Sequence, residues 1–122
     1  MLSIASENVG DMAILKCDGR LVQSDAAFKL RQAVIAEADA RVIVLDLTEV
    51  HAIEGGGLGM LWALQRWADD QGIELKLFNP IGSVKNRLEH YNAMMHFHIA
   101  SVGEMIVMLA TQRAGEEHAH AA

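Results

Sequence analysis

The sequence has a single cysteine, no cluster of basic residues and no long apolar run. Cys17 cannot form an internal disulfide, and we interpret it as a core residue because it lies in an apolar, strand-like run. Ten basic residues against 16 acidic ones give a net charge of −6, which argues against nucleic-acid binding. No run reaches the ~18 apolar residues of a membrane span, and the first residues lack the features of a signal peptide. We therefore expect a cytoplasmic protein.

The composition is that of one ordered domain. Of the 122 residues, 52% are hydrophobic and 21% are charged, a balance that is typical of a globular fold. A chain of this length can bury one hydrophobic core but not two. We expect a single domain over residues 1–113. From residue 114 to residue 122 the sequence is small, polar and aperiodic, which predicts a disordered tail.

The pattern of apolar residues predicts an α/β fold. The run from Arg41 to Leu47 is continuously β-branched and aliphatic, as in a central strand that has parallel neighbours and is covered on both faces. In the last expected helix, Ile106 and Leu109 should face inward. The expected strands are 2–9, 12–17, 41–47, 73–78 and 97–99. The first two expected helices begin at Ser24 and at Gly55, and the second ends near Gln71. The other two begin after Pro80 and after the capping-box residues Ser101 and Glu104.

This order of elements, and two stretches within it, resemble the STAS domain of bacterial anti-sigma factor antagonists. Residues 42–61, VIVLDLTEVHAIEGGGLGML, are similar to the signature of that family, in which a buried strand ends in Asp-Leu-Ser/Thr and Asp-Ser-Ser-Gly-Leu-Gly opens the next helix. Residues 75–80 resemble the segment that follows. The resemblance covers residues 3–112 and implies a mixed sheet of about five strands with about four helices. It also implies binding to an anti-sigma factor or a related regulatory kinase or switch protein, without catalysis and without a cofactor.

The resemblance also implies a partner-binding site at the glycine turn. Glu54 stands at the acidic position of the signature, Gly55 at its first serine and Gly56 at its second, which is the phosphorylated switch serine of the family. Gly57-Leu58-Gly59 is kept. Because Gly56 has no hydroxyl, the resemblance implies docking without the usual phosphorylation switch.

A helical wheel divides the predicted helix 55–71 into two sides. Five residues are expected to face the sheet: Met60, Leu61, Leu64, Trp67 and Ala68. Four are expected to face away from it: Gln65, Arg66, Asp69 and Asp70. Leu58 and Trp62 fall on the second side, next to the glycines, so they could anchor a partner, because aromatic residues contribute strongly to interfaces. Alternatively, the next helix or a chain end covers Trp62.

Other residues near the turn have two readings each. Thr48 could replace the missing serine as a phosphoacceptor, or its hydroxyl could form a turn hydrogen bond. Glu54 could complement the helix dipole or simply be solvated. The three glycines could hold a phosphate, but no Lys-Ser/Thr pair follows, so a tight turn is favoured. Ser83 is expected to cap the helix after Pro80.

The histidines do not predict a metal site. The closest pairs are His96 with His98 and His118 with His120, and neither has cysteines or carboxylates at ligand spacing. His51 has no serine or cysteine beside it, so the sequence shows no catalytic triad.

Three functions are compatible with the sequence. The first is a partner-binding module of the anti-sigma factor antagonist type. The second is a STAS subunit without a switch, as in a stressosome or a lipid or anion transporter. The third is a small nucleotide-binding domain. A homo-oligomer is compatible with each of them.

Overall fold

The computed structural model of the chain describes residues 1–22 and 24–121, with side chains to residue 114. The elements follow the predicted order. The strands are β1 (Leu2–Val9), β2 (Met12–Leu21), β3 (Val42–Ile53), β4 (Glu74–Phe78) and β5 (Ile99–Ala100). The helices are α1 (Ser24–Ile35), α2 (Gly55–Gln71), α3 (Gly82–Met95) and α4 (Val102–Ala121).

Within the described residues, the strands form one five-stranded sheet in the order β1-β2-β3-β4-β5. β1 and β2 form an antiparallel hairpin, whose turn contains Gly10 with a φ of 58°. β2, β3, β4 and β5 are mutually parallel. The predicted α/β fold with a mixed sheet is therefore confirmed, and β3 has the central place that its continuous apolar run indicated.

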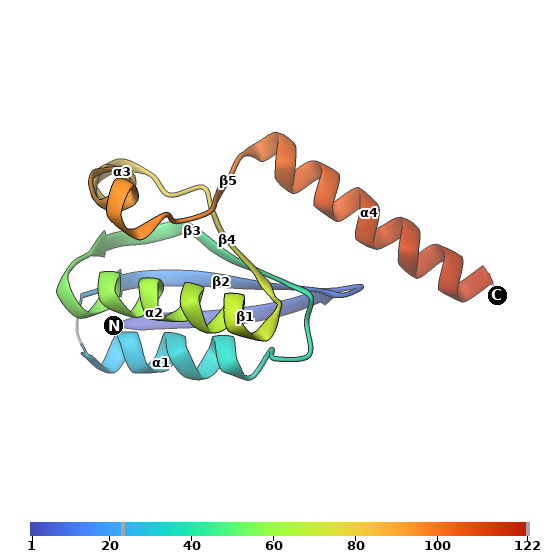
Figure 1. The fold of residues 1–122 in the computed structure, drawn as a ribbon, viewed down its shortest axis with the longest axis horizontal. Coiled ribbons are helices and arrows are strands. Elements are labelled where there is room, and N and C mark those ends of the chain that lie inside the picture. The colour runs from blue at the N-terminus through green and yellow to red at the C-terminus, as the bar shows by residue number, and fades with distance from the viewer. Residues whose placement is uncertain (23, 122) are drawn as a thin grey trace.

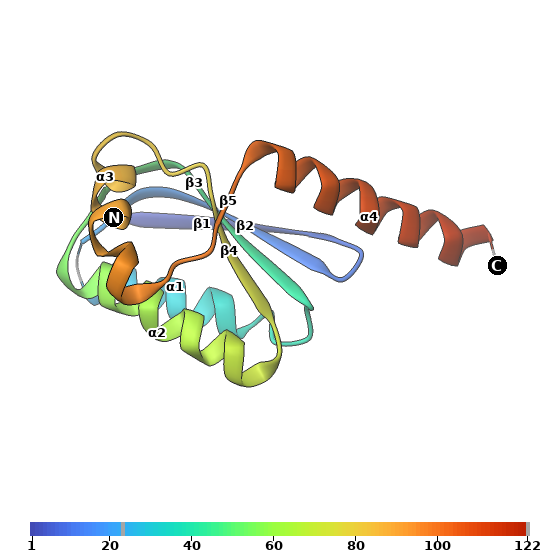
Figure 2. The same cartoon turned by 45° about the horizontal axis from the view of Figure 1, so that its top comes forward.

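The helices cover the two faces of the sheet unequally (Figure 1). α1 and α2 lie side by side on one face, where they bury the larger core cluster with the side chains of β2, β3 and β4. On the other face, α4 packs Met105 against Met12 and Val44 in a much smaller cluster. Figure 2 shows that α4 then extends beyond the β1–β2 hairpin. No described helix is long and apolar enough to span a bilayer.

β2 and β3 are longer than the sequence predicted. β3 continues past Leu47 to Ile53, and β2 continues past Cys17 to Leu21, with the pairs Gly19–Val50 and Leu21–Ile53 joining the added segments. Two register shifts between β2 and β3, each with one extra residue in β3, keep these segments paired, as β-bulges do. Polar residues in both segments resemble turn sequences, so the pattern alone ended the strands too early.

The last helix differs from its prediction in orientation. Met105 is buried, whereas Ile106 is 61% exposed, so the inward position predicted for Ile106 is wrong. Leu109 packs partly against the smaller cluster. The capping box is confirmed, because the Glu104 N–H donates to Ser101 Oγ at 3.1 Å and the Ser101 N–H donates to Glu104 Oε1 at 3.4 Å. The backbone of α4 is helical to Ala121. Because the side chains from residue 115 and all of residue 122 lie outside the described part, the division at residue 113 stays a prediction.

Candidate docking surface at the start of helix α2

The turn from β3 into α2 is formed by Glu54 and three glycines. Glu54 is the N-cap residue, with extended backbone angles of −153° and 161°, and its N–H donates to the Leu21 carbonyl at 3.3 Å. A Cβ at Gly57 would overlap the carbonyl oxygen of Leu21, at the end of β2. Glycine is therefore required at this position, because the helix backbone packs directly on the strand.

The neighbouring glycines have different surroundings. A Cβ built at Gly55, Gly56 or Gly59 would meet no atom within 4 Å. Gly55 has a φ of 47°, where an L side chain is strained, whereas Gly56 and Gly59 lie outside this left-handed region. The outer side of the first α2 turns is thus a bare backbone surface, and steric contact does not require glycine at Gly56.

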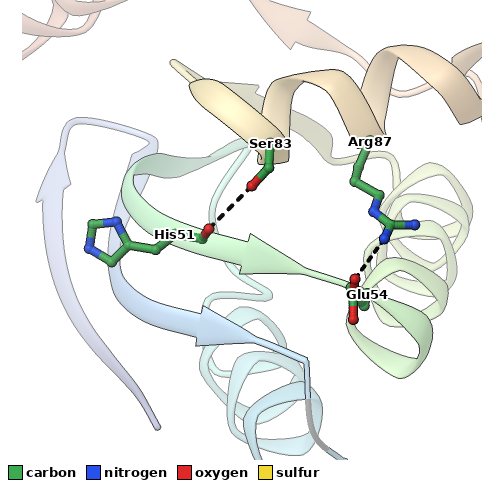
Figure 3. Close-up of polar contacts among 4 residues, drawn as sticks. All are labelled: His51, Glu54, Ser83 and Arg87. Carbon is green, nitrogen blue, oxygen red and sulfur yellow. Dashed lines mark hydrogen bonds and ion pairs between the residues drawn. The ribbon is translucent and has the colours of Figure 1, made fainter.

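Glu54 forms an ion pair across the turn, which neither reading of its role anticipated. Its side chain makes no capping hydrogen bond. Instead, Arg87 Nη2 on α3 donates to Glu54 Oε1 at 2.6 Å (Figure 3). Both side chains are about half exposed, so we expect the pair to position α3 more than to stabilise the fold. The sequence carries no signal for this pair, because its two residues come from different elements 33 positions apart.

A second contact holds α3 against the end of β3. The Ser83 hydroxyl donates to the His51 carbonyl at 3.3 Å (Figure 3). The N-cap residue of α3 is Ile81, so the prediction that Ser83 caps this helix is wrong. α3 starts at Gly82, two residues earlier than a Ser83 cap would place it, and the Ser83 side chain is free to reach β3.

Trp62 lies on the outer side of α2, as the wheel predicted. Its side chain is 39% exposed, and the Arg66 guanidinium carbon lies 5.1 Å from its ring centroid, a cation–π distance. Leu58 is only 6% exposed, so its predicted exposure is wrong and its side chain cannot form part of the surface. We define the α2 surface as Glu54, Gly55, Gly56, Gly59 and Trp62.

The sheet-facing side of α2 is largely as predicted. Leu61, Leu64 and Ala68 are buried, and Met60 and Trp67 pack partly against the core. Gln65 is also buried, which contradicts its predicted outward position. Its Nε2 donates to the carbonyls of Met95 and His96 at 3.1 and 2.6 Å, at the end of α3. The wheel grouped Gln65 with the charged residues of the outer side. In the structure its side chain instead donates to two main-chain acceptors at a helix end.

Thr48, in the middle of β3, lies in a hydrogen-bonded chain with Asp46 of the same strand and with Asn79, which follows β4. Its hydroxyl donates to Asp46 Oδ1 at 2.6 Å and accepts from Asn79 Nδ2 at 3.0 Å. The Thr48 N–H also donates to Asp46 Oδ1, at 3.0 Å. This arrangement matches the reading of Thr48 as a structural hydroxyl. A phosphate there would stand beside a carboxylate, which is unfavourable.

The described residues form no cluster that could hold a metal ion. No group of three or more potential metal ligands occurs among them, and the side chains of His118 and His120 lie outside that part. Cys17 is buried in the larger core cluster, as predicted. Burial, with a smaller contribution from the charge of Asp46, raises the pKa of the Cys17 thiol to about 12. The thiol is therefore protonated and unsuited to nucleophilic chemistry at neutral pH.

Comparison with protein families decides the relationship, because the STAS domain model matches residues 3–104. The chain belongs to the STAS domain family. An Arabidopsis thaliana protein named "Probable sulfate transporter 3.4" is 40% identical to it over 48 residues. The match covers 39% of this chain and 7% of the length of that relative.

Solved STAS structures have the same fold at low sequence identity. An anti-sigma factor antagonist from Mycobacterium paratuberculosis superposes with a TM-score of 0.73 at 16% identity, covering 90% of this chain and 95% of that chain. The murine anion transporter called solute carrier 26 family member A9 superposes with a TM-score of 0.70 at 18% identity. That match covers 86% of this chain and 18% of the transporter. Both antagonists and transporters thus contain this fold.

Proposed function

We propose that this chain is a partner-binding module of a bacterial regulatory system, of the anti-sigma factor antagonist type. It binds an anti-sigma factor or a related kinase through the α2 surface, by docking and not by catalysis. In this proposal Gly56 stands where the family has its switch serine, so that binding is not controlled by phosphorylation at this position.

The observation that carries the proposal is the bare backbone at Gly56. A side chain at this position would meet only open space, and its φ is ordinary, so neither packing nor strain explains the glycine. By contrast, Gly57 next to it is required by contact with Leu21. A glycine without a structural role in the monomer is explained if a partner backbone approaches the helix there. Trp62 supplies an aromatic side chain at the margin of the same surface.

The structural match to an antagonist supports this class of partner. The antagonist from Mycobacterium paratuberculosis and this chain cover nearly all of each other. The murine and Arabidopsis transporter matches use a small part of a much longer protein, whereas a sulfate transporter family protein from Wolinella succinogenes is covered over 87% of its chain.

Gly56→Asp tests the proposal. A carboxylate is favourable at a helix N-terminus, so the variant should fold with an unchanged melting temperature. The charge would stand where the partner backbone packs, and an unpaired charge in an interface is costly. We expect binding to fall at least about 30-fold in calorimetric titrations with candidate anti-sigma factors from the same genome. Gly56→Ser, which adds a small neutral group, is the matched control and should keep most of the affinity. Full binding by a folded Gly56→Asp protein would contradict the proposed surface.

A second candidate is a STAS subunit without a switch, in a stressosome or beside a lipid or anion transporter. The 48-residue match to the Arabidopsis protein favours the transporter form. Co-purification from the native host separates the two candidates: recovery of a membrane transporter in place of an anti-sigma factor would replace the first proposal by the second.

Nucleotide binding is the remaining alternative, and it has a direct test. The glycine turn is followed by Leu58 and lacks the lysine that a P-loop needs. We expect no thermal stabilisation by ATP or GTP, although a ligand at ~100 times its dissociation constant would add about 2.7 kcal/mol to the free energy of unfolding. Stabilisation by nucleotide that is lost in Gly56→Asp would favour this alternative.

A further inference from the structure

The outer edge of β1 is open in the described structure. β1 forms one margin of the sheet and pairs only with β2. The Arg20 N–H donates to the Met1 carbonyl at 3.1 Å, so these two residues form a hydrogen-bonded pair of the antiparallel ladder, and such pairs recur at every second residue. The intervening residues are Leu2, Ile4, Ser6 and Asn8, and their main-chain N–H and C=O groups point away from β2. Within the described part of the chain these groups have no hydrogen-bond partner.

This edge lacks most of the features that usually prevent strand pairing. The sequence of β1, LSIASENV, contains no lysine, arginine or proline, and its eight residues pair with β2 without a register shift. The opposite margin of the sheet is protected by its length, because β5 has only two residues. The open main-chain groups of β1 therefore specify another β-strand as the ligand.

We propose that β1 pairs antiparallel with β1 of a second copy of this chain, around a two-fold axis at Ala5. In this register Ile4 lies opposite Ser6 of the second copy, and Leu2 lies opposite Asn8. In this register the outward main-chain groups of Leu2, Ile4, Ser6 and Asn8 on both strands all form hydrogen bonds. The two five-stranded sheets then form one continuous sheet.

The charges on β1 favour a second copy as the occupant. Glu7 is the one charged residue of the strand, and this register sets it opposite Ser3, whose hydroxyl can donate to the carboxylate. No like charges face each other. An axis at Glu7 would instead set two carboxylates opposite, which is destabilising. At the centre, Ala5 faces Ala5 of the second copy, and these small side chains allow close approach.

A hollow beside β1 fits the same arrangement. It has a volume of about 310 Å³ between the start of β1 and α1, and its lining includes Leu2, Asp25 and Lys29. The register brings Asn8 of the second copy next to Leu2, on the α1 face of the sheet. There, Asp25 and Lys29 offer a carboxylate and an ammonium group to the Asn8 amide, which in the single chain donates to Glu37 Oε2 at 3.3 Å. The end of one hairpin thus lies beside the hollow of the other copy.

Such a dimer would present the α2 surface twice. α1 separates the β1 edge from α2 on the same face of the sheet, so the pairing does not require contact with α2 (Figure 1). A dimer with two separate docking surfaces can bind a dimeric partner with increased avidity. The pairing of β1 does not depend on the proposed function, because its test uses this chain alone.

Disulfide trapping tests the register. In a non-hydrogen-bonded antiparallel pair the Cα atoms lie roughly 4.5 Å apart, within the range of a disulfide. Ala5→Cys should therefore form a covalent dimer under mild oxidation. Ser3→Cys is the matched control, because the two Ser3 positions lie four residues apart along the strands, roughly 13 Å, and should not crosslink. The native Cys17 is buried and should not react. Equal crosslinking of both variants, or none by Ala5→Cys, would overturn this register.

Light scattering across a concentration series tests the dimer itself. The mass of the wild-type protein should rise from 13.3 kDa toward twice that value with increasing concentration. Ser6→Pro removes an outward N–H and leaves the β1–β2 ladder intact, so its circular dichroism should match that of the wild type. Its dimer dissociation constant should rise at least about tenfold, whereas Ser6→Ala should leave this constant unchanged. A wild-type protein that stays monomeric to about 1 mM, or a Ser6→Pro dimer of unchanged affinity, would refute the proposal.

Discussion

The inner and outer sides of the first α2 turns use the same residue type for opposite reasons. On the inner side, Gly57 is fixed by contact with the Leu21 carbonyl, and Leu58 is buried beside it. On the outer side, Gly56 and Gly59 face open space, and Trp62 remains partly exposed. A glycine in such a signature can therefore serve the fold at one position and leave a surface bare at the next. Only the surroundings of each Cβ distinguish the two cases.

The largest expected effect comes from Gly57→Ala. The added Cβ would overlap the main-chain carbonyl of Leu21 at the end of β2, and neither backbone can move without separating α2 from β2. We expect the free energy of unfolding to fall by at least about 3 kcal/mol, at the upper end of the usual cost of overpacking. Gly56→Ala is the matched control and should change it by less than about 0.5 kcal/mol. Urea unfolding of both variants measures the difference. Equal stability of the two variants would show that the inner and outer glycines of α2 do not differ in their structural role.

Trp62→Ala should affect binding more than folding. We expect the partner affinity to fall about 30-fold, equivalent to about 2 kcal/mol, while the free energy of unfolding changes by less than about 1 kcal/mol. Trp67→Ala provides the contrast, because that ring packs partly against the core and its loss should destabilise the fold instead. Titration calorimetry and thermal unfolding measure the two quantities. If the two tryptophan variants lose stability equally, the exposed ring of Trp62 has a structural role.

Gln65→Leu should cost about 1–2 kcal/mol of stability. The substitution preserves the approximate volume but leaves the Met95 and His96 carbonyls without their side-chain donor. The loss should appear as an earlier transition in chemical denaturation, with unchanged partner affinity. A variant as stable as the wild type would show that water satisfies these carbonyls equally well.

The smallest effect is expected from Arg87→Ala. Its ion pair with Glu54 is about half exposed, so we expect a change of at most about 0.5 kcal/mol in stability. Because this pair joins α3 to the first residue of the docking turn, partner affinity should fall a few-fold. Glu54→Gln is the conservative comparison and should retain a hydrogen bond to Arg87. A large loss of stability in Arg87→Ala would mean that α3 depends on this contact for its position.

The sequence predicted elements wherever a local pattern decides the structure. The continuous apolar run in β3 indicated its central position, and α2 ends at Gln71 as predicted, followed by Gly72 in a left-handed conformation. The Ser101–Glu104 capping box formed as expected. In each case the determining interactions lie within a few residues of one another, so spacing along the chain was sufficient.

Other features depended on contacts between distant segments. These are the limits of β2 and β3, the burial of Leu58 and Gln65, and the Glu54–Arg87 pair. The added strand residues are stabilised by pairing across β2 and β3, with shifts in register that no local pattern encodes. Gln65 is buried because the end of α3 needs donors there, and Arg87 reaches Glu54 because α3 packs beside the start of α2. By itself the sequence determined the family, the order of the elements and the glycine turn. The tertiary structure decided which glycine serves the fold and which is left bare, because that depends on the atoms other segments place around each Cβ.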